Sequence, residues 1–233
     1  MAKIVSWRPL RLIKLVFLCL FVGHAFANDD PLEAGNRKIH GFNEYADAKF
    51  LRPIAKIYER TLPTNLRSGV TNFFSNLESV NNALNSALQM KIGESLQELT
   101  RFCLNTTIGI GGFFDPASRL TITDSDEDFG QTFSVWGIGR GNYIVLPFFG
   151  PSTVKDAVGS SLDFIANPTR LYNPTEQQLF FSATDVVNNR AELLPVENVV
   201  FGDKYLFYKN AYLQRREFLE LDGQVVDSFD DEF

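Results

Sequence analysis

The clearest periodic pattern in the sequence lies between residues 65 and 90. Apolar side chains recur there every three or four residues, which places them on one face of an α-helix. They are Leu66, Val70, Phe73, Leu77, Val80, Leu84 and Leu88. The opposite face is rich in asparagine and serine, and Glu78 is its one charged side chain. A helix surface in bulk water usually carries more charge, so this polar face is unusual.

The same spacing predicts further helices. They are expected at 39–50, after Pro53, at 94–107, from 154, from 175 and at about 204–220. Thr153 followed by Asp156 is a capping box, and Thr175 and Asp203 are further helix-start residues. The first helix is predicted to end near Arg52-Pro53. Because no repeat or linker divides the chain, we predict a single all-α domain.

Two glycine-rich segments interrupt the helices. The first contains Gly109, Gly111 and Gly112, and the second has glycines alternating from 137 to 141. Glycine permits close approach of one backbone to another. The second segment leads into the uncharged run YIVLPFFGP at 143–151. This run is far too short to span a bilayer, yet it is apolar enough to require burial.

The two ends of the chain differ from its centre. A basic start, the apolar run 15–22 and the small residues Ala25 and Ala27 predict a secretory signal peptide over 1–27. An uncleaved N-terminal anchor is the alternative. Residues 221–233 are acidic and predicted to be disordered. The helical domain is therefore expected over 28–220.

Charge excludes one class of function. Without the four basic residues of the leader, 18 Lys and Arg face 28 Asp and Glu, a net charge of −10. Nucleic-acid binding needs a basic patch, so it is not predicted. Anionic lipid headgroups would also repel this chain. Any contact with a membrane must then come from the burial of apolar side chains.

Few residues offer catalytic or metal chemistry. Beyond the leader, Cys103 is the single cysteine and His40 the single histidine, so neither a disulfide nor a zinc site is predicted. The acidic run 124–128 lacks the glycine and the last glutamate of a calcium loop. No nucleophile elbow or phosphate-binding loop occurs. We therefore predict no catalytic residue, no metal and no cofactor.

Phenylalanines occur in adjacent pairs. The pairs are Phe73-Phe74, Phe113-Phe114, Phe148-Phe149 and Phe180-Phe181. Neighbours on a helix point about 100° apart, so a pair widens the apolar face. The pattern fits a large aromatic core or burial in lipid, and the sequence leaves both open.

Three blocks of sequence carry a resemblance to a known family. They are DPLEAGNRKIHGFN at 30–43, RFCLNTTIGIGGFFDPA at 101–117 and FGQTFSVWGIGRGNYIVLPFFGPSTVKDAVG at 129–159. They resemble the signature blocks of the MlaA/VacJ family of outer-membrane phospholipid-handling proteins of Gram-negative bacteria. The resemblance extends over roughly 30–212.

The resemblance implies a fold, a function and partners. The fold would be a ring of amphipathic helices embedded in one leaflet of the outer membrane around a polar channel. The protein would remove mislocalised phospholipids from the outer leaflet and pass them to a periplasmic carrier protein, which maintains lipid asymmetry. It would associate with outer-membrane porin trimers on the periplasmic side, and it would not be an enzyme.

The resemblance also assigns roles to residues. Phe42 and Asn43 match positions implied in channel gating. The polar face of helix 65–90 would line the channel through Asn72, Asn76, Ser79 and Asn82. The predicted membrane-embedded residues are Phe73, Phe74, Phe113, Phe114, Phe148 and Phe149.

One feature departs from the family, and two alternative functions remain. Well-known relatives are lipoproteins acylated at a cysteine, whereas Cys19 follows Leu18 rather than a small residue, so no acylation is predicted. One alternative is a periplasmic hydrolase that uses His40 as a base. The other is a structural adaptor that binds porins without moving lipid.

Overall fold

The computed structural model describes residues 30–168, 175–200 and 202–224. Helices make up nearly all of the regular structure in this part of the chain. The elements are α2 (Glu33–Ala46), the π-helix η1 (Asp47–Leu51), α3 (Arg52–Thr61), α4 (Thr64–Leu88), α5 (Ile92–Thr107), α6 (Pro116–Arg119), α7 (Phe129–Val135), β1 (Tyr143–Leu146), β2 (Gly150–Thr153), α8 (Val154–Ala166), α9 (Thr175–Glu192), the 3₁₀ helix η3 (Leu194–Val199) and α10 (Lys204–Glu220). The predicted signal peptide and residues 225–233 of the predicted tail lie outside the described residues.

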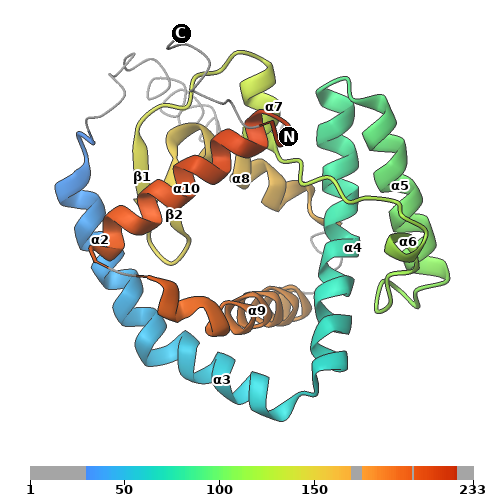
Figure 1. Cartoon of the computed structure of the whole chain (residues 1–233), viewed down its shortest axis with the longest axis horizontal. Helices are drawn as coiled ribbons and strands as arrows, with labels where there is room; N and C mark the ends of the chain where they lie inside the picture. Colours follow the sequence, from blue (N-terminus) through green and yellow to red (C-terminus); the bar gives the residue numbers. More distant parts are fainter. Residues whose placement is uncertain (1–29, 169–174, 201, 225–233) are drawn as a thin grey trace, which may run out of the picture.

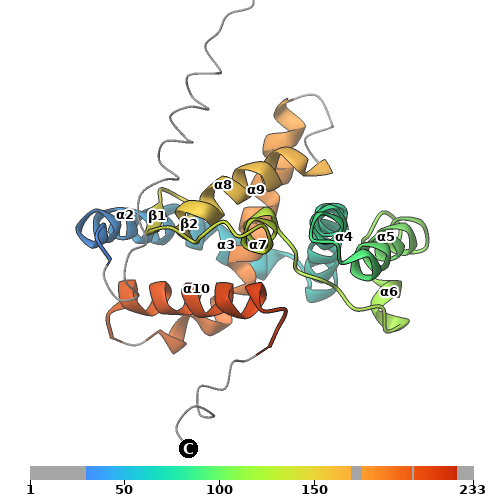
Figure 2. The ribbon, with the colours of Figure 1, turned by 90° about the horizontal axis from the view of Figure 1, so that it is seen from above.

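The elements follow one another around a ring (Figure 1). α2, α3, α4, α8 and the β1–β2 hairpin form its circuit, and α5 and α6 lie outside α4. Seen from above, α10 lies on one side of the band that contains α2, the hairpin, α4 and α5 (Figure 2). The ring arrangement implied by the family resemblance is confirmed.

Capping side chains set the starts of several helices, as the sequence predicts. The backbone N–H of Asp156 donates to Oγ1 of Thr153 at 3.1 Å, which caps α8. Asp203 caps α10 in the same way, and its side chain accepts from the N–H of Leu206. The predicted helices 65–90 and 94–107 correspond to α4 and α5.

The first predicted helix does not end near Pro53. α2 begins at Glu33 and passes through the π-helical turn η1 directly into α3. Pro53 lies in the first turn of α3. A proline has no backbone N–H to donate, and the π-helical turn η1 just before it changes the hydrogen-bond register, so the helix continues past Pro53.

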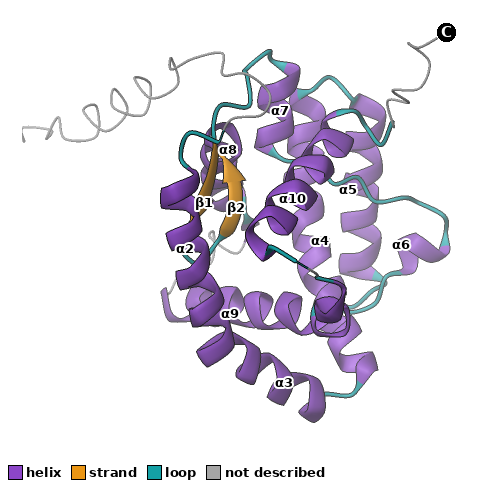
Figure 3. Ribbon diagram, turned by 60° about the vertical axis from the view of Figure 1, so that its left-hand side comes forward, coloured by secondary structure: helices purple, strands orange, loops and turns teal. Residues whose placement is uncertain are grey.

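The run YIVLPFFGP forms a small hairpin among the helices, and the predicted all-α fold class is confirmed. β1 and β2 pair antiparallel, with Tyr143 opposite Thr153 and Leu146 opposite Gly150. Figure 3 shows the hairpin beside α2. Asn36 and Asn43, which are seven residues apart on α2, join this helix to the hairpin. Asn36 donates to the carbonyl of Tyr143 at 3.1 Å and accepts from the N–H of Val145 at 2.9 Å. Asn43 likewise donates one hydrogen bond to the backbone of the hairpin tip and accepts another from it.

Polar and apolar side chains are distributed unlike those of a water-soluble domain. Among the described residues, seven hydrophobic residues are buried, four of them alanines, whereas nineteen polar or charged residues are buried. Phe50, Ile57, Ile108, Ile110 and Phe149 are all exposed. A water-soluble domain buries its large apolar side chains instead. The molecule thus has a polar interior and an apolar surface.

Candidate functional site

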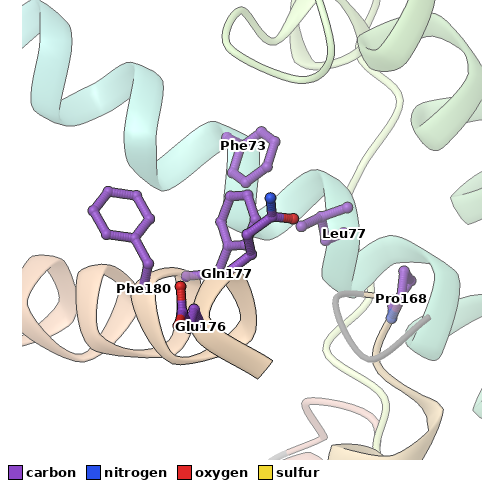
Figure 4. Close-up of a pocket in the computed structure, with 7 residues that line it drawn as sticks. Phe73, Leu77, Pro168, Glu176, Gln177 and Phe180 are labelled. Atoms are coloured by element: carbon purple, nitrogen blue, oxygen red, sulfur yellow. The ribbon is translucent and has the colours of Figure 1, made fainter. Parts of the chain in front are cut away.

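A cavity of about 620 Å³ lies between α4, α9 and Pro168, which is two residues beyond the end of α8. Phe73, Leu77, Phe180 and Phe181 supply most of its lining, together with Pro168, Glu176 and Gln177 (Figure 4). The rings of Phe73 and Phe181 stack with their centroids 6.0 Å apart, which joins the two helices. Mostly apolar lining with a few polar groups is typical of small-molecule sites of this size.

Glu78 follows Leu77 on α4 and places a charged side chain beside this mostly apolar wall. Its side chain is exposed to water, yet nearby protein atoms partly desolvate its carboxyl group. This burial, together with the negative charges of Asp185, Asp126 and Asp124, raises its pKa to about 7. Burial also raises the pKa of Asp185 on α9. The wall between α4 and α9 is therefore apolar with a concentration of carboxylates beside it.

We expect Glu78→Gln to stabilise the protein at pH 8 and to leave stability unchanged at pH 4. The native carboxyl group holds its proton to a higher pH than its ordinary value of 4.5, so the free energy of unfolding of the unmodified protein falls as pH rises from about 4.5 to about 7. Because water screens this side chain, the gain at pH 8 should be about 1 kcal/mol. Thermal unfolding in detergent at both pH values measures it, with Glu217→Gln on the exposed part of α10 as control. An equal effect at both pH values would contradict the prediction.

The second feature of the site is the hairpin tip, where the structure brings the predicted gating residues together. Asn43 donates to the carbonyl of Leu146 at 2.9 Å and accepts from the N–H of Phe148 at 2.8 Å. The rings of Phe42 and Phe148 meet edge to face with centroids 5.1 Å apart. Phe148 has a φ of +66°, which side-chain-bearing residues rarely adopt. Asn43 therefore helps to hold a strained turn in place.

The polar face of α4 does not lie where the sequence predicts. Asn76 and Ser79 are buried between α4 and α5, and Asn76 donates to Oγ1 of Thr106 at 2.9 Å. Asn72 and Asn82 donate to the carbonyls of Phe113 and Ser125. The channel-lining assignment of Asn76 and Ser79 is therefore corrected, because side chains packed between two helices cannot line an open channel.

Close packing at glycines explains this placement. A Cβ on Gly112 would lie 2.6 Å from the Cβ of Asn76, so the glycine-rich segment presses directly against the polar face of α4. A Cβ on Gly69 would lie 2.2 Å from the ring of Phe113. Asn72 and Asn82 therefore provide hydrogen bonds to a neighbouring backbone. The glycines at 109, 111 and 112 are the signal of this packing in the sequence, because glycine permits close approach to a neighbouring helix.

The six phenylalanines predicted to contact lipid fall into two groups. Phe114, Phe148 and Phe149 are exposed, and Phe149 is 85% exposed. Phe73, Phe74 and Phe113 are half-buried. Phe73 lines the cavity, and Phe113 covers Gly69. Phe180 and Phe181 were noted in the sequence only as a pair, and the structure places both in the cavity wall.

Comparison with known proteins decides what kind of molecule this is. A family model described as "MlaA lipoprotein" matches residues 28–219. This chain belongs to the MlaA family. Curated relatives called "Intermembrane phospholipid transport system lipoprotein MlaA" occur in Escherichia coli and Shigella flexneri. Each is 32% identical over 203 residues, which cover 84% of this chain and 80% of the relative. An uncharacterized protein of Rickettsia bellii is 32% identical over 192 residues, covering 81% of this chain and 75% of the relative.

A solved MlaA-like structure shares the fold. It comes from work on the "structural basis for maintenance of bacterial outer membrane lipid asymmetry". The match has a TM-score of 0.74 and 30% sequence identity, and it covers 83% of this chain and all of the solved chain. The resemblance predicted from the three sequence blocks is confirmed.

His40 has the surroundings of a packed side chain within this MlaA fold. Its ring lies against those of Tyr205 and Tyr208, with centroids 5.8 and 5.7 Å away. Its Nε2 atom is 3.8 Å from Glu44. In the described part of the chain, no group of three or more acidic, histidine or cysteine side chains is placed to hold a metal ion.

Proposed function

We propose that this MlaA-family chain removes mislocalised phospholipids from the outer leaflet of the Gram-negative outer membrane and passes them to a periplasmic carrier. It acts as a conduit without catalysing a reaction, and it associates with porin trimers. Lipid asymmetry of the membrane is maintained as a result. The names of the curated relatives support this role.

The observation that carries the proposal is the polar interior within an apolar surface. Large apolar side chains are exposed on the outer elements of the ring, among them Phe50, Ile54 and Ile57 on η1 and α3, and Leu96 and Leu99 on α5. In water this surface would be unfavourable, but each such side chain contributes about 1.5–3 kcal/mol when it leaves water. Within the described ranges, no helix has the length and hydropathy needed to cross a bilayer. Embedding in a single leaflet accounts for both facts.

The polar channel and its gate belong to the same proposal. The hairpin tip, held by Phe42 and Asn43, is the segment that we propose to act as the gate. It is strained at Phe148, and backbone strain of this kind is often stored at segments that switch between two positions. Exposed Phe148 and Phe149 would contact acyl chains beside the ring.

A complementation experiment tests the transport role. Cells lacking the gene should accumulate phospholipid in the outer leaflet, measured by lipid A palmitoylation or by surface labelling of amine headgroups. The native chain should restore the normal level. His40→Ala should restore it equally well, because we assign no catalytic role to that ring. Loss of complementation by His40→Ala, in protein that folds normally, would favour the hydrolase.

Anchoring needs its own experiment, since the relatives are called lipoproteins and Cys19 lies in a context that does not predict acylation. Outer membranes that contain the native chain are washed with high salt and with carbonate. We expect the protein to remain bound, because apolar burial does not depend on ionic strength or pH. Mass spectrometry of the mature N-terminus shows whether an acyl chain is present. Release of an unacylated protein would contradict embedding through apolar side chains.

A further inference from the structure

We infer that the cavity between α4 and α9 binds one acyl chain of a phospholipid whose headgroup carries an amine, with that amine beside Glu78 and Asp185. This inference rests on the proposed function and names the substrate class that the site prefers. It joins two neighbouring features of one wall, an aromatic cavity and a set of carboxylates.

The cavity has the chemistry of an acyl-chain site. Three phenylalanine rings and the side chains of Leu77 and Pro168 form its walls, and Glu176 and Gln177 are its polar groups. Figure 4 shows the rings of Phe73 and Phe180, which come from the two different helices α4 and α9. Apolar walls hold an alkyl chain through burial alone and would not hold a hydrated headgroup. The volume of about 620 Å³ is within the usual range for small-molecule sites.

The carboxylates lie within one helical turn of this lining. Glu78 is the neighbour of Leu77 on α4, and Asp185 lies four residues after Phe181, on the same face of α9. The negative charge of Asp185 helps to raise the pKa of Glu78, which indicates that the two carboxyl groups lie near each other. The charges that act most strongly on Glu78 are those of Asp185, Asp126 and Asp124, and all are negative.

These charges select among phospholipids. An ammonium group placed beside Glu78 and Asp185 relieves the repulsion between them, whereas an anionic headgroup such as glycerol phosphate adds to it. A phospholipid with one chain in the aromatic cavity would have its headgroup near the surface of the wall, where these carboxylates lie. A zwitterionic amine phospholipid therefore satisfies both features at once, and phosphatidylglycerol satisfies only the first.

The test measures which lipids stay with the protein. The full chain is purified in detergent, incubated with vesicles of equimolar phosphatidylethanolamine and phosphatidylglycerol, and repurified, and the retained lipids are quantified by mass spectrometry. We compare the unmodified chain with Leu77→Trp, which fills the cavity, and with Phe180→Ser, which makes its wall polar. Glu78→Gln tests the headgroup preference. Leu99→Trp, on an exposed part of α5 away from the cavity, is the matched control.

The expected results separate the cavity from the proposed function. The unmodified chain should retain phospholipid with the amine lipid in excess. Leu77→Trp and Phe180→Ser should retain roughly five- to tenfold less, and Leu99→Trp should retain the normal amount. Glu78→Gln should retain normal total lipid with the amine preference reduced about threefold.

Other results would contradict either the proposed transport function or the proposed lipid site in the cavity. If the unmodified chain retains no phospholipid, the proposed function itself is contradicted. If it retains phospholipid and both cavity variants do so equally well, the cavity is not the lipid site, although the proposed function stands. Phe180 is exposed, so its replacement should not unfold the protein, and Phe180→Ser remains informative if Leu77→Trp does not fold. An unchanged headgroup ratio in Glu78→Gln would contradict the role of the carboxylates.

Discussion

Replacement of Arg216 by methionine should lower the free energy of unfolding by about 3–5 kcal/mol. Arg216 is buried on α10, and its guanidinium group donates to both oxygens of Asp128 and to Oδ1 of Asp156, the latter at 2.9 Å. Burial alone would lower the pKa of this arginine, but the hydrogen bonds and charges of Asp128 and Asp156 raise it overall. Methionine fills much of the same space but removes the cation that bridges Asp128 and Asp156, and Asp156 keeps only the more distant Lys155, whose Nζ is 3.9 Å from its Oδ1.

The effect should be large because both carboxylates have a second task. Asp128 caps α7 by accepting from the N–H of Gln131 at 2.8 Å. Asp156 belongs to the capping box of α8 and also accepts from the hydroxyl of Tyr212 at 2.7 Å. Arg216 therefore holds the starts of two helices against α10. An unpaired buried charge destabilises a protein by more than the intact ion pair stabilises it. The expected loss is therefore large.

The neighbouring arginine provides the control. Arg215 pairs with Asp126 at 3.0 Å, but both side chains are largely exposed. Arg215→Met should change the free energy of unfolding by less than about 1 kcal/mol. Thermal unfolding in detergent compares the two variants, and Arg216→Met should melt roughly 10 °C lower than Arg215→Met. Equal melting temperatures would show that the network on Arg216 contributes little.

Helix α4 shows what the spacing of apolar residues can and cannot predict. The spacing of its apolar residues predicts both its existence and its length, and the structure confirms them to within two residues at each end. Periodicity divides a helix into two faces but does not say what each face meets. The polar face is expected from the sequence to line a channel, whereas in the structure it packs on α5 and on the glycine-rich segment. In a molecule with an apolar exterior, polarity is a poor guide to exposure.

Neither the hairpin nor the cavity can be predicted from the sequence, and the reasons are related. A short apolar run such as residues 143–146 fits a strand or a buried helical segment equally well, and only its partner strand and the asparagines of α2 decide. The cavity joins Phe73 to Phe180 and Phe181, which are more than a hundred residues away in the sequence. Adjacent phenylalanines indicate a wide apolar face, but they do not say that two such faces meet.

Replacement of Gly159 by alanine should lower the free energy of unfolding by about 3 kcal/mol. Gly159 lies on α8 at the point where this helix crosses α7. A Cβ there would lie 2.6 Å from the backbone nitrogen and 2.9 Å from the Cα of Gly130. Backbone atoms cannot rotate out of the way as a side chain can, so the two helices must separate.

Separation of α7 from α8 would also disturb the network on Arg216. Gly130 is itself packed tightly, since a Cβ on it would lie 2.5 Å from Oδ1 of Asp156 and 2.6 Å from Nη2 of Arg216. A shift of α7 therefore moves Asp128 relative to Arg216. For this reason, the effects of Gly159→Ala and Arg216→Met should be less than additive when the two changes are combined.

Gly35→Ala is the matched control for Gly159→Ala. Gly35 lies within α2, and a Cβ there meets no atom within 4 Å. Alanine at this site should stabilise the protein by about 0.5 kcal/mol, because it restricts the unfolded chain and favours the helix. Thermal unfolding of the two variants should thus show shifts of opposite sign. A Gly159→Ala protein as stable as the unmodified chain would contradict the close crossing of α7 and α8.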